Sequence, residues 1–294
     1  MMALMFGKVA IIGIGHIGSS LARVIRAGGL AEQLVAVDIN PRHRAEASAL
    51  GLADEVVDTV GGAVTGADLV VLATPVGSYA DLAPAIAPFL KPGAIVTDVG
   101  SVKMAAIRDI GPALPAGVHF VPAHPVAGTE NSGPSSGFAE LFRGRWCILT
   151  PPPGTHDAAV AKVADLWQAA GSMVEIMEAG HHDRVLAITS HLPHLIAYTI
   201  VGTATDLEAS LQQEVIKFSA SGFRDFTRIA ASDPVMWRDI FLNNREAVLE
   251  ILQRFTEDLT ALQRAIRWGE GDKLQELFTR TRAIRRSIID AKQA

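Results

Sequence analysis

The segment Lys8-Val-Ala-Ile-Ile-Gly13-Ile-Gly15-His-Ile-Gly18 leads from a short apolar run directly into a helical pattern. A strand followed by G-x-G-x-x-G and a helix is the arrangement that binds a dinucleotide. Gly13 permits the tight turn, Gly15 lets the backbone approach a pyrophosphate, and Gly18 lets the helix pack close to the strand. The phosphates would then accept hydrogen bonds from free N–H groups at the helix N-terminus. The predicted phosphate-binding residues are Gly13, Ile14, Gly15, His16, Ile17 and Gly18.

An acidic residue stands at the end of the second predicted strand. Asp38 follows Gly18 at the distance where a carboxylate can accept hydrogen bonds from the adenosine ribose hydroxyls. Because this carboxylate would repel a 2′-phosphate, NAD is favoured over NADP, although Arg42 and Arg44 nearby could weaken that preference. Two alternatives remain open: a glycine-rich turn without a ligand, and an Asp38 that only caps its strand.

Short apolar runs alternate with helical stretches in the first part of the chain. Such runs are typical of parallel strands buried on both faces, and the alternation indicates a doubly wound α/β sheet. The predicted strands are 8–12, 34–38, 69–73, 94–98, 118–121, 146–150 and 173–176. We therefore expect an α/β fold, with an N-terminal Rossmann-type cofactor domain over 1–177 followed by an all-α dimerisation domain over 178–294.

The second domain is predicted to consist of helices. One begins near His182 and contains Pro193, which should kink it because proline removes an N–H donor. Another begins at Asp233-Pro234 and carries an apolar stripe to Ile266, a length of about 35 residues or roughly 50 Å. Such a helix is longer than its domain is wide. We therefore expect its stripe to be covered in a homodimer built on the C-terminal helices.

The bulk composition argues against several classes of partner. The net charge of −5 and the pI near 6.0 argue against a nucleic acid. The most apolar later stretch, 185–204, contains His191, Pro193 and His194, which argues against a membrane span. The single cysteine, Cys147, permits no intrachain disulfide and is predicted to be buried in a strand. We expect a soluble cytoplasmic enzyme that acts on a small molecule.

Five further motifs follow the glycine-rich segment. They are TDVGSVK at 97–103, HPVAGTENSG at 124–133, SHLPH at 190–194, GFRDFTR at 222–228 and DPVMW at 233–237. This set, in this order, resembles the prephenate/arogenate dehydrogenases of tyrosine biosynthesis, and the resemblance covers roughly residues 8–268. It implies oxidation of a cyclohexadienol at C4, transfer of a hydride to NAD, and loss of the C1 carboxylate as CO₂.

The resemblance also implies roles for single residues. His124 matches the catalytic histidine that hydrogen-bonds the 4-hydroxyl group, a task that suits a neutral imidazole near pH 7. Arg228 matches the arginine that binds a substrate carboxylate, with Arg224 as the alternative. A surface ion pair between Arg228 and Asp225 is the competing interpretation. His194 matches a second active-site histidine beside the substrate side chain.

The remaining predicted site residues surround these groups. Ser101 is expected to contact the substrate or the nicotinamide carboxamide, and Lys103 to add positive potential at the same mouth. Thr74 and Pro75 are expected to shape the loop beside the nicotinamide. The positions that match residues lining or gating the family's pocket are Glu130, Asp225 and Trp237, although Trp237 could equally be a core residue at a helix start.

Two histidine-rich stretches, 190–194 and 181–183, are not predicted to hold a metal ion. We predict no metal site, because the i, i+3 pair His191 and His194 lacks a further evident ligand. The stretch from His181 to Asp183 is interpreted as a helix N-terminus, where Asp183 is favourable at the positive end. No regulatory domain is evident after the helices, so control by a separate tyrosine-binding domain is not expected.

Two other functions are compatible with parts of the sequence. A β-hydroxyacid dehydrogenase would carry a catalytic lysine and then an asparagine early in its helical domain, and 182–203 contains neither. A non-catalytic NAD(H)-sensing protein would need the glycine loop but not His124 together with Arg228. Prephenate and L-arogenate differ only in a keto or amino group, and no residue chooses between them. The compact layout suits a cyclohexadienyl dehydrogenase that accepts both.

Overall fold

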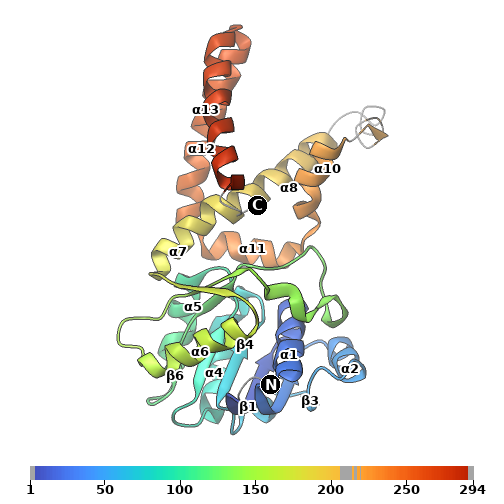
Figure 1. The fold of residues 1–294 in the computed structure, drawn as a ribbon, viewed down its shortest axis with the longest axis vertical. Helices are drawn as coiled ribbons and strands as arrows, with labels where there is room; N and C mark the ends of the chain where they lie inside the picture. The colour runs from blue at the N-terminus through green and yellow to red at the C-terminus, as the bar shows by residue number, and fades with distance from the viewer. Residues whose placement is uncertain (1–3, 206–213, 215–216, 219, 291–294) are drawn as a thin grey trace. The chain divides into compact units, whose positions relative to one another are not determined.

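The computed structural model describes residues 4–205, 214, 217–218 and 220–290 (Figure 1). It divides into two compact units, Met1–Arg245 and Glu246–Ala294. The strands are β1 (Phe6–Ile12), β2 (Ala31–Val37), β3 (Glu55–Val57), β4 (Leu69–Leu72), β5 (Ile95–Asp98), β6 (His119–Phe120), β7 (Ala123–Pro125), β8 (Trp146–Leu149) and β9 (Met173–Ile176). The helices of the first unit are α1 (His16–Gly28), α2 (Pro41–Ala49), α3 (Val60–Val64), α4 (Tyr79–Ile86), α5 (Lys103–Ile110), α6 (Asp157–Ala169), α7 (Ala179–Leu186), α8 (Leu192–Thr205), α10 (Ser221–Thr227) and α11 (Pro234–Asn243).

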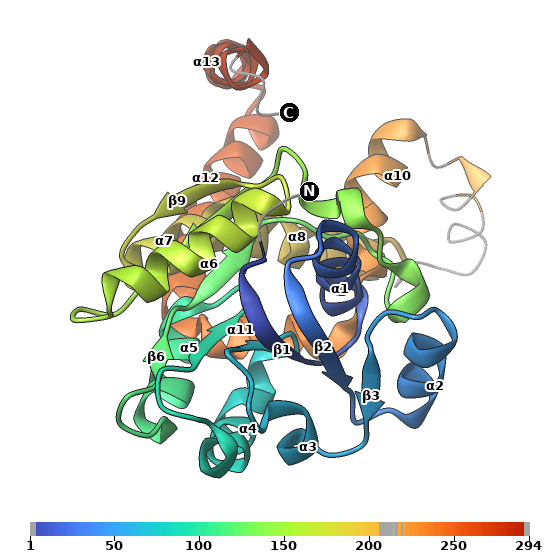
Figure 2. The ribbon, with the colours of Figure 1, turned by 60° about the horizontal axis from the view of Figure 1, so that its bottom comes forward.

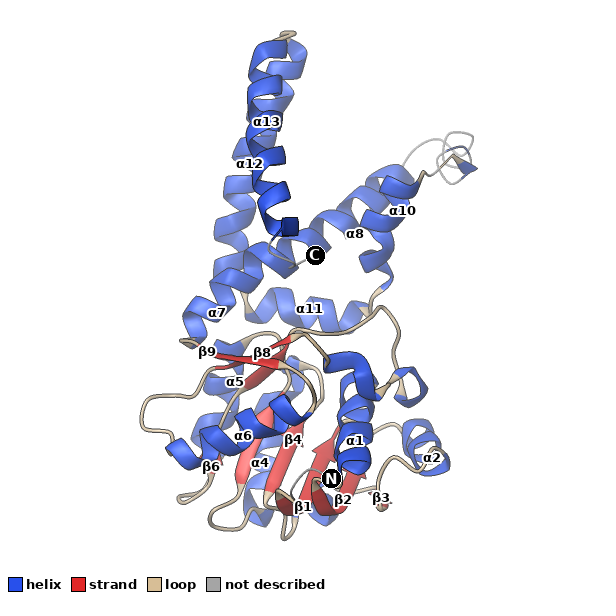
Figure 3. Cartoon of the chain, viewed as in Figure 1, coloured by secondary structure: helices blue, strands red, loops and turns tan. Residues whose placement is uncertain are grey.

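A six-stranded parallel sheet forms the centre of the first unit (Figure 3). Its strand order is β3-β2-β1-β4-β5-β6, with every neighbouring pair parallel. This is the order of a Rossmann fold, whose ligand crevice lies at the carboxyl ends of the strands where the order reverses, here between β1 and β4. The predicted doubly wound fold is confirmed.

Both faces of this sheet are apolar, as continuous apolar strands require. In β1, Val9 and Ile11 belong to a core that includes residues of α1 and α6, whereas Ala10 and Ile12 belong to a second core with residues of α3, α4 and α5. Figure 2 shows α1 and α6 on one side of β1 and β2, with α3 and α4 on the other. The alternation follows from the two-residue period of a strand.

Two predicted strands lie outside the main sheet. Segments 146–150 and 173–176 correspond to β8 and β9, which pair in parallel in a separate three-stranded sheet. The third strand is β7, which runs antiparallel to β8 and pairs His124 with Ile148. The short strands β3 and β7 were not predicted. This second sheet gives His124 the extended backbone of a paired strand.

The kink expected at Pro193 takes a specific form. Between α7 and α8, residues Ala187–His191 form one π-helical turn, which ends two residues before the proline. A π-helical turn is a known way for a helix to absorb an irregularity, often at functional sites. By length and composition, Ala179–Ala204 could span a membrane. However, it carries the buried side chains of His182, Asp183 and His191, which would be costly in lipid.

The predicted single helix from Pro234 to Ile266 is wrong. The helix α11 ends at Asn243, and α12 (Arg245–Arg267) begins after Asn244, whose φ of −105° and ψ of 31° leave the helical region. Asn244 is buried, and its side-chain amide donates to the Asp183 carbonyl. That tertiary contact gives a physical reason for the break. The sequence around Asn244 contains no proline or glycine that would have predicted it.

The division into units also differs from the expected domains. Trp237 and Ile240 of α11 belong to the same apolar core as α4 and α5, and α7 contacts α5. By its contacts the first compact unit extends to Arg245, so this division does not test the predicted domain boundary at 177, which stays a prediction. The second unit consists of α12 and α13 (Gly271–Asp290), joined at Gly269 with a φ of 67°. Large apolar side chains are exposed on both helices: Leu249, Leu259, Ile266, Phe278 and Ile284.

Candidate active site

The glycine-rich turn after β1 has the close contacts that its glycines predict. Gly13 has a φ of 92°, and a Cβ there would lie 2.5 Å from the carbonyl oxygen of Ala73. A Cβ on Gly18 would lie 2.0 Å from the carbonyl oxygen of Gly13. These two positions exclude any side chain, because the turn and the start of α1 are packed against each other and against β4. A Cβ on Gly15 would meet no described atom within 4 Å, which leaves this side of the turn open to a ligand.

The N-terminus of α1 and the end of β2 face this turn. The first turn of α1 has no side-chain cap and no acidic residue, so its N–H groups suit a phosphate. Asp38 follows β2 directly, and its carboxylate accepts hydrogen bonds from the backbone N–H of Ile14 (3.0 Å) and of Asn40 (2.8 Å). Arg44 donates to the Asp38 carbonyl oxygen at 2.8 Å. These residues fit the pyrophosphate and adenosine ribose of a dinucleotide.

The other expected cofactor residues lie at neighbouring strand ends. Thr74 and Pro75 follow β4, and the Thr74 hydroxyl lies 2.8 Å from that of Ser78. Ser101 is half-buried between β5 and α5. Because the carboxyl ends of parallel strands share one edge, these residues lie at the edge of the sheet where a Rossmann fold binds its ligand, and their contact with the nicotinamide stays a prediction.

Lys103 lies in a different environment from the one expected. Its side chain is completely buried and does not reach the mouth of the site. The ammonium donates to Asp98 Oδ2 at 2.5 Å and to the Ala123 carbonyl oxygen at 2.6 Å. Asp98 in turn accepts from the hydroxyl of Tyr79 at 3.1 Å and from the Ala123 N–H at 3.2 Å. The buried ion pair therefore ties β5 and α5 to Ala123, the residue next to His124.

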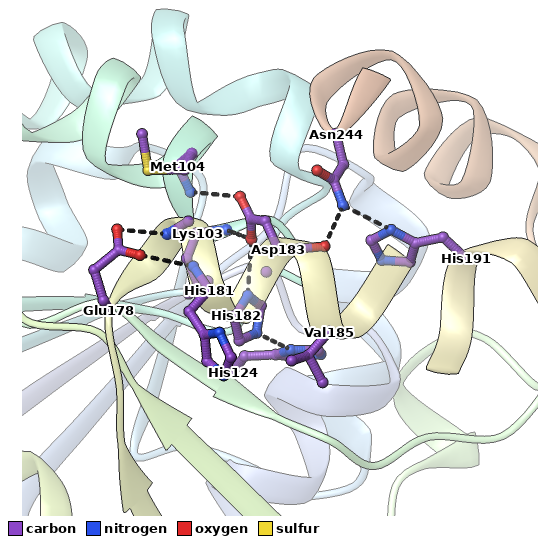
Figure 4. A network of polar contacts seen from close by, with 12 residues as sticks. Lys103, Met104, His124, Glu178, His181, His182, Asp183, Val185, His191 and Asn244 are labelled. Atoms are coloured by element: carbon purple, nitrogen blue, oxygen red, sulfur yellow. Dashed lines mark hydrogen bonds and ion pairs between the residues drawn. The ribbon is translucent and has the colours of Figure 1, made fainter. Parts of the chain in front are cut away.

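His124 is a buried histidine in β7. Its Nδ1 lies 2.8 Å from Nε2 of His182 on α7 (Figure 4). Burial lowers the pKa of His124 well below the ordinary histidine value, and the charges of His182, Lys103 and His191 act in the same direction. The imidazole is therefore neutral at pH 7, which is the form a general base requires.

Sequence reasoning missed His182 and Asp183 as parts of this site. Asp183 does not cap its own helix but accepts from the backbone N–H groups of Lys103 (2.7 Å) and Met104 (2.9 Å) at the start of α5. Its Oδ1 also lies 2.7 Å from Nδ1 of His182. The pair HD at 182–183 offers no local indication of these contacts, because the partners lie about 80 residues away in the sequence.

His191 and His194 have separate partners. The side-chain amide of Asn244 lies 3.1 Å from Nδ1 of His191, and His194 Nδ1 lies 2.8 Å from the Ser190 carbonyl oxygen. The ring of His194 stacks on Trp237, with centroids 3.6 Å apart. In the described part of the chain, no group of three metal-ligating side chains forms. The absence of a metal remains a prediction.

Arg228 pairs with a different carboxylate from the one considered. One guanidinium nitrogen donates to Glu130 Oε2 at 2.7 Å, and the Arg228 side chain is 58% exposed. Asp225 and Arg224 are exposed on α10, one turn earlier. Burial lowers the pKa of His194, and the positive charge of Arg228 acts in the same direction, which places the two side chains in one electrostatic environment. The structure therefore groups Arg228 with Glu130 and His194 with Trp237.

The burial of His191 predicts that the stability of the fold depends on pH. Burial lowers its pKa from 6.5 to about 4 in the folded chain. Below pH 6.5 the unfolded chain binds a proton that the folded chain does not, so stability falls as the pH drops towards 4. Between pH 6.5 and 4 we expect the unfolding free energy of His191→Gln to fall by about 3 kcal/mol less than that of the wild type. Urea unfolding at each pH measures both. An exposed control, His181→Gln, should follow the wild type, and identical pH slopes in all three proteins would contradict the assignment.

The glycine turn, the uncapped α1 N-terminus, Asp38 and the buried His124 define a dinucleotide-binding enzyme of the Rossmann class. Comparison with known proteins is more specific. The chain matches the nucleotide-binding domain of prephenate dehydrogenase over residues 21–176 and its dimerization domain over residues 178–280. It is 44% identical to the cyclohexadienyl dehydrogenase of Zymomonas mobilis over 96% of each chain. The chain therefore belongs to the prephenate dehydrogenase family.

Solved structures agree with this assignment. The chain is 34% identical to prephenate dehydrogenase from A. aeolicus in complex with hydroxyphenyl propionate and NAD⁺, with a TM-score of 0.90 over 98% of this chain and 100% of that one. It is 26% identical to Synechocystis arogenate dehydrogenase, with a TM-score of 0.78 over 95% and 98%. The family resemblance of the sequence motifs is confirmed.

Proposed function

We propose that this chain oxidises and decarboxylates both prephenate and L-arogenate with NAD, forming 4-hydroxyphenylpyruvate and L-tyrosine. The observation that carries the proposal is a buried, neutral His124 at the carboxyl edge of a Rossmann sheet, in the same compact unit as the guanidinium of Arg228. Similarity to a cyclohexadienyl dehydrogenase supports the broad substrate range.

The residues of the chain have distinct tasks in this reaction. A bound dinucleotide would supply the hydride acceptor. Gly13, Gly15, Gly18 and Asp38 would hold its pyrophosphate and adenosine ribose, and Thr74, Pro75 and Ser101 would lie beside its nicotinamide. His124 accepts the proton of the C4 hydroxyl as the hydride leaves C4, and returns it to the phenolate oxygen after CO₂ departs. Because His124 returns the same proton to the product, the site needs no proton path to bulk water.

NAD is the proposed cofactor rather than NADP. The carboxylate of Asp38 lies at the end of β2, where it would repel a 2′-phosphate. We expect Asp38→Ser to lower kcat/KM with NAD by about 10-fold or more, the value of lost hydrogen bonds to a charged group. The ratio of activity with NADP to activity with NAD should rise in this variant. An unchanged ratio in steady-state assays would show that Asp38 only organises the turn.

Arg228 is the proposed partner of a substrate carboxylate. Its guanidinium is exposed and bonded to Glu130, so a carboxylate can replace Glu130 at the same nitrogen. We expect Arg228→Ala to raise KM for prephenate about 10- to 100-fold, as the loss of charge-assisted hydrogen bonds implies. Arg224 lies on α10, one turn before Arg228, so Arg224→Ala is the matched control and should change KM little. The reverse pattern would assign the carboxylate to Arg224.

We also propose that the active form is a cytoplasmic homodimer. The family match over residues 178–280 is to a dimerization domain. The exposed apolar side chains of α12 and α13, such as Leu259 and Ile266, are of the kind that a homodimer interface covers. In this proposal the cofactor domain is 1–177 and the substrate and dimerisation domain is 178–294, with Asp225 and Trp237 at the edge of the pocket.

The proposal is tested by NADH and NADPH formation with each substrate. Turnover of both substrates with NAD⁺ would support a cyclohexadienyl dehydrogenase. Turnover of only one would restrict the substrate range and direct attention to the surroundings of His194. NAD⁺ binding without turnover of either substrate would favour an NAD(H)-sensing protein, and turnover of a β-hydroxyacid alone would favour that other dehydrogenase class.

A further inference from the structure

A chain of three side chains extends from the catalytic edge to the start of α5. His124, His182 and Asp183 are joined by contacts of 2.8 Å and 2.7 Å, and all three are buried (Figure 4). Figure 4 shows the His182 ring between His124 and Asp183. Each contact joins one donor to one acceptor, so the protonation of one end determines the protonation of the others.

Asp183 is the ionised end of this chain. Its two oxygens accept hydrogen bonds from the backbone N–H groups of Lys103 and Met104, in the first turn of α5. A backbone N–H can only donate. Val102, the residue before α5, provides no side-chain cap, so Asp183 is what satisfies this turn. A carboxylate, whose oxygens only accept hydrogen bonds, is the form that fits these donors.

An ionised Asp183 determines the tautomer of His182. The carboxylate can only accept, so His182 Nδ1 must carry a proton and donate it across the 2.7 Å contact. Burial lowers the pKa of His182, with Asp183 acting in the opposite direction, so the neutral ring has one proton only. Nε2 of His182 is then an acceptor that faces His124.

We propose that His182 and Asp183 are positioning residues that force the proton of His124 onto Nδ1 and leave its Nε2 lone pair free as the base. The argument rests on the proposed role of His124. His124 Nδ1 must donate to His182 Nε2, because two lone pairs could not face each other at 2.8 Å. The same hydrogen bond stabilises the imidazolium that forms when His124 takes the hydroxyl proton, and the carboxylate of Asp183 balances the charge.

The proton inventory of the reaction suits such a closed chain. The C4–H electron pair leaves as hydride to the nicotinamide, and the hydroxyl proton moves to His124 Nε2. When the bond from C1 to the carboxylate breaks, its electron pair enters the ring and CO₂ leaves. The phenolate oxygen then takes back the proton from Nε2, so no net proton is released. A buried base with a buried partner can therefore complete the cycle.

Other charged groups around the pair do not change the assignment. Lys103 faces both rings from α5, Asp98 faces His182 from β5, and His191 faces His124 from the π-helical turn. Cys147 on β8 is close to the His124 backbone, and burial raises the pKa of its thiol, so it stays neutral. Lys103 is already bonded to Asp98 and Ala123, whereas Asp183 is the group within hydrogen-bond distance of His182 Nδ1 among the described residues.

The tautomer itself is measurable without turnover. In protein labelled with ¹⁵N-histidine, long-range ¹H–¹⁵N spectra at pH 7 distinguish a protonated from an unprotonated ring nitrogen. The His124 signals are assigned by their loss in His124→Asn. We expect His124 to be protonated at Nδ1 and unprotonated at Nε2. A proton on Nε2 would overturn the proposal, whatever the activity of the enzyme.

Kinetics of paired variants give the second test. His182→Leu removes the acceptor, whereas His182→Gln keeps an acceptor oxygen near the position of Nε2. We expect His182→Leu to lower kcat about 10- to 100-fold, less than loss of the base itself, with little change in KM or NAD⁺ affinity. His182→Gln should regain most of the loss, and the exposed neighbour variant His181→Leu should match the wild type.

The results separate the positioning role from the proposed function. Wild-type kcat in His182→Leu, or a His182→Gln as inactive as His182→Leu while both bind NAD⁺, would overturn the positioning role. A wild-type enzyme that turns over neither prephenate nor L-arogenate would instead contradict the proposed function. The tautomer measurement on the wild-type protein would still decide the positioning role if a variant failed to fold.

Discussion

His124→Asn is expected to lower kcat by about 10²–10⁴-fold, the usual contribution of a positioned general base. Asparagine can keep a hydrogen bond to the substrate hydroxyl, but it cannot take the proton as the hydride leaves. The turn at Gly13 and the carboxylate of Asp38 are separate from this residue in the structure, so the dissociation constant for NAD⁺ should be unchanged. Steady-state kinetics and NAD⁺ titration on the same preparation measure both effects.

The pH profile provides the control for this prediction. Because burial keeps His124 neutral far below pH 6.5, the wild-type kcat should stay nearly constant between pH 8 and 6.5 and fall only at lower pH. The residual activity of the variant should lack that fall. A fully active His124→Asn, or a variant that loses NAD⁺ binding along with activity, would contradict the role of His124 as base.

Lys103→Met is expected to destabilise the fold by about 3–5 kcal/mol, because it leaves the Asp98 carboxylate buried without its cation. Both side chains are completely buried, and the carboxylate cannot regain water without opening the core between β5 and α5. The free energy of unfolding from urea denaturation measures the loss. NAD⁺ binding and kcat should be read at a temperature where the variant is still folded.

An exposed ion pair of similar geometry is the matched control. Lys91 and Asp68 also lie 2.5 Å apart, but their side chains are 42% and 35% exposed. Lys91→Met should therefore cost about 1 kcal/mol or less. The double variant Asp98→Asn/Lys103→Met should lose less unfolding free energy than the two single variants lose together, since it leaves no buried charge without a partner. Equal losses in Lys103→Met and Lys91→Met would show that the buried pair has no special role.

The fold was largely predictable because its decisive features are local. Apolar runs such as 69–73 are typical of strands buried on both faces, and Gly13 and Gly18 occupy positions where the structure leaves no room for a Cβ. The three-residue strands β3 and β7 are too short for a pattern to reveal. The break at Asn244 depends on hydrogen bonds to Asp183 and His191, which sequence periodicity cannot show.

The positions of the site residues were predictable only where a single local motif determines them, and their roles stay predictions. His124, Asp38 and the glycine turn occupy the places that their motifs indicate. The surroundings of Lys103 and Asp183 were not foreseen, since a lysine and an aspartate usually lie at the surface and here both are buried. Their partners come from distant segments, and only the folded chain shows that Asp183 caps α5 and holds His182.

The stoichiometry of the reaction with prephenate tests the proposed oxidative decarboxylation itself. NADH, CO₂ and 4-hydroxyphenylpyruvate should form in equal amounts when the purified chain is incubated with prephenate and NAD⁺, and His124→Asn should slow all three together. NADH formation without CO₂, or no NADH from either prephenate or L-arogenate while NAD⁺ still binds, would contradict the account.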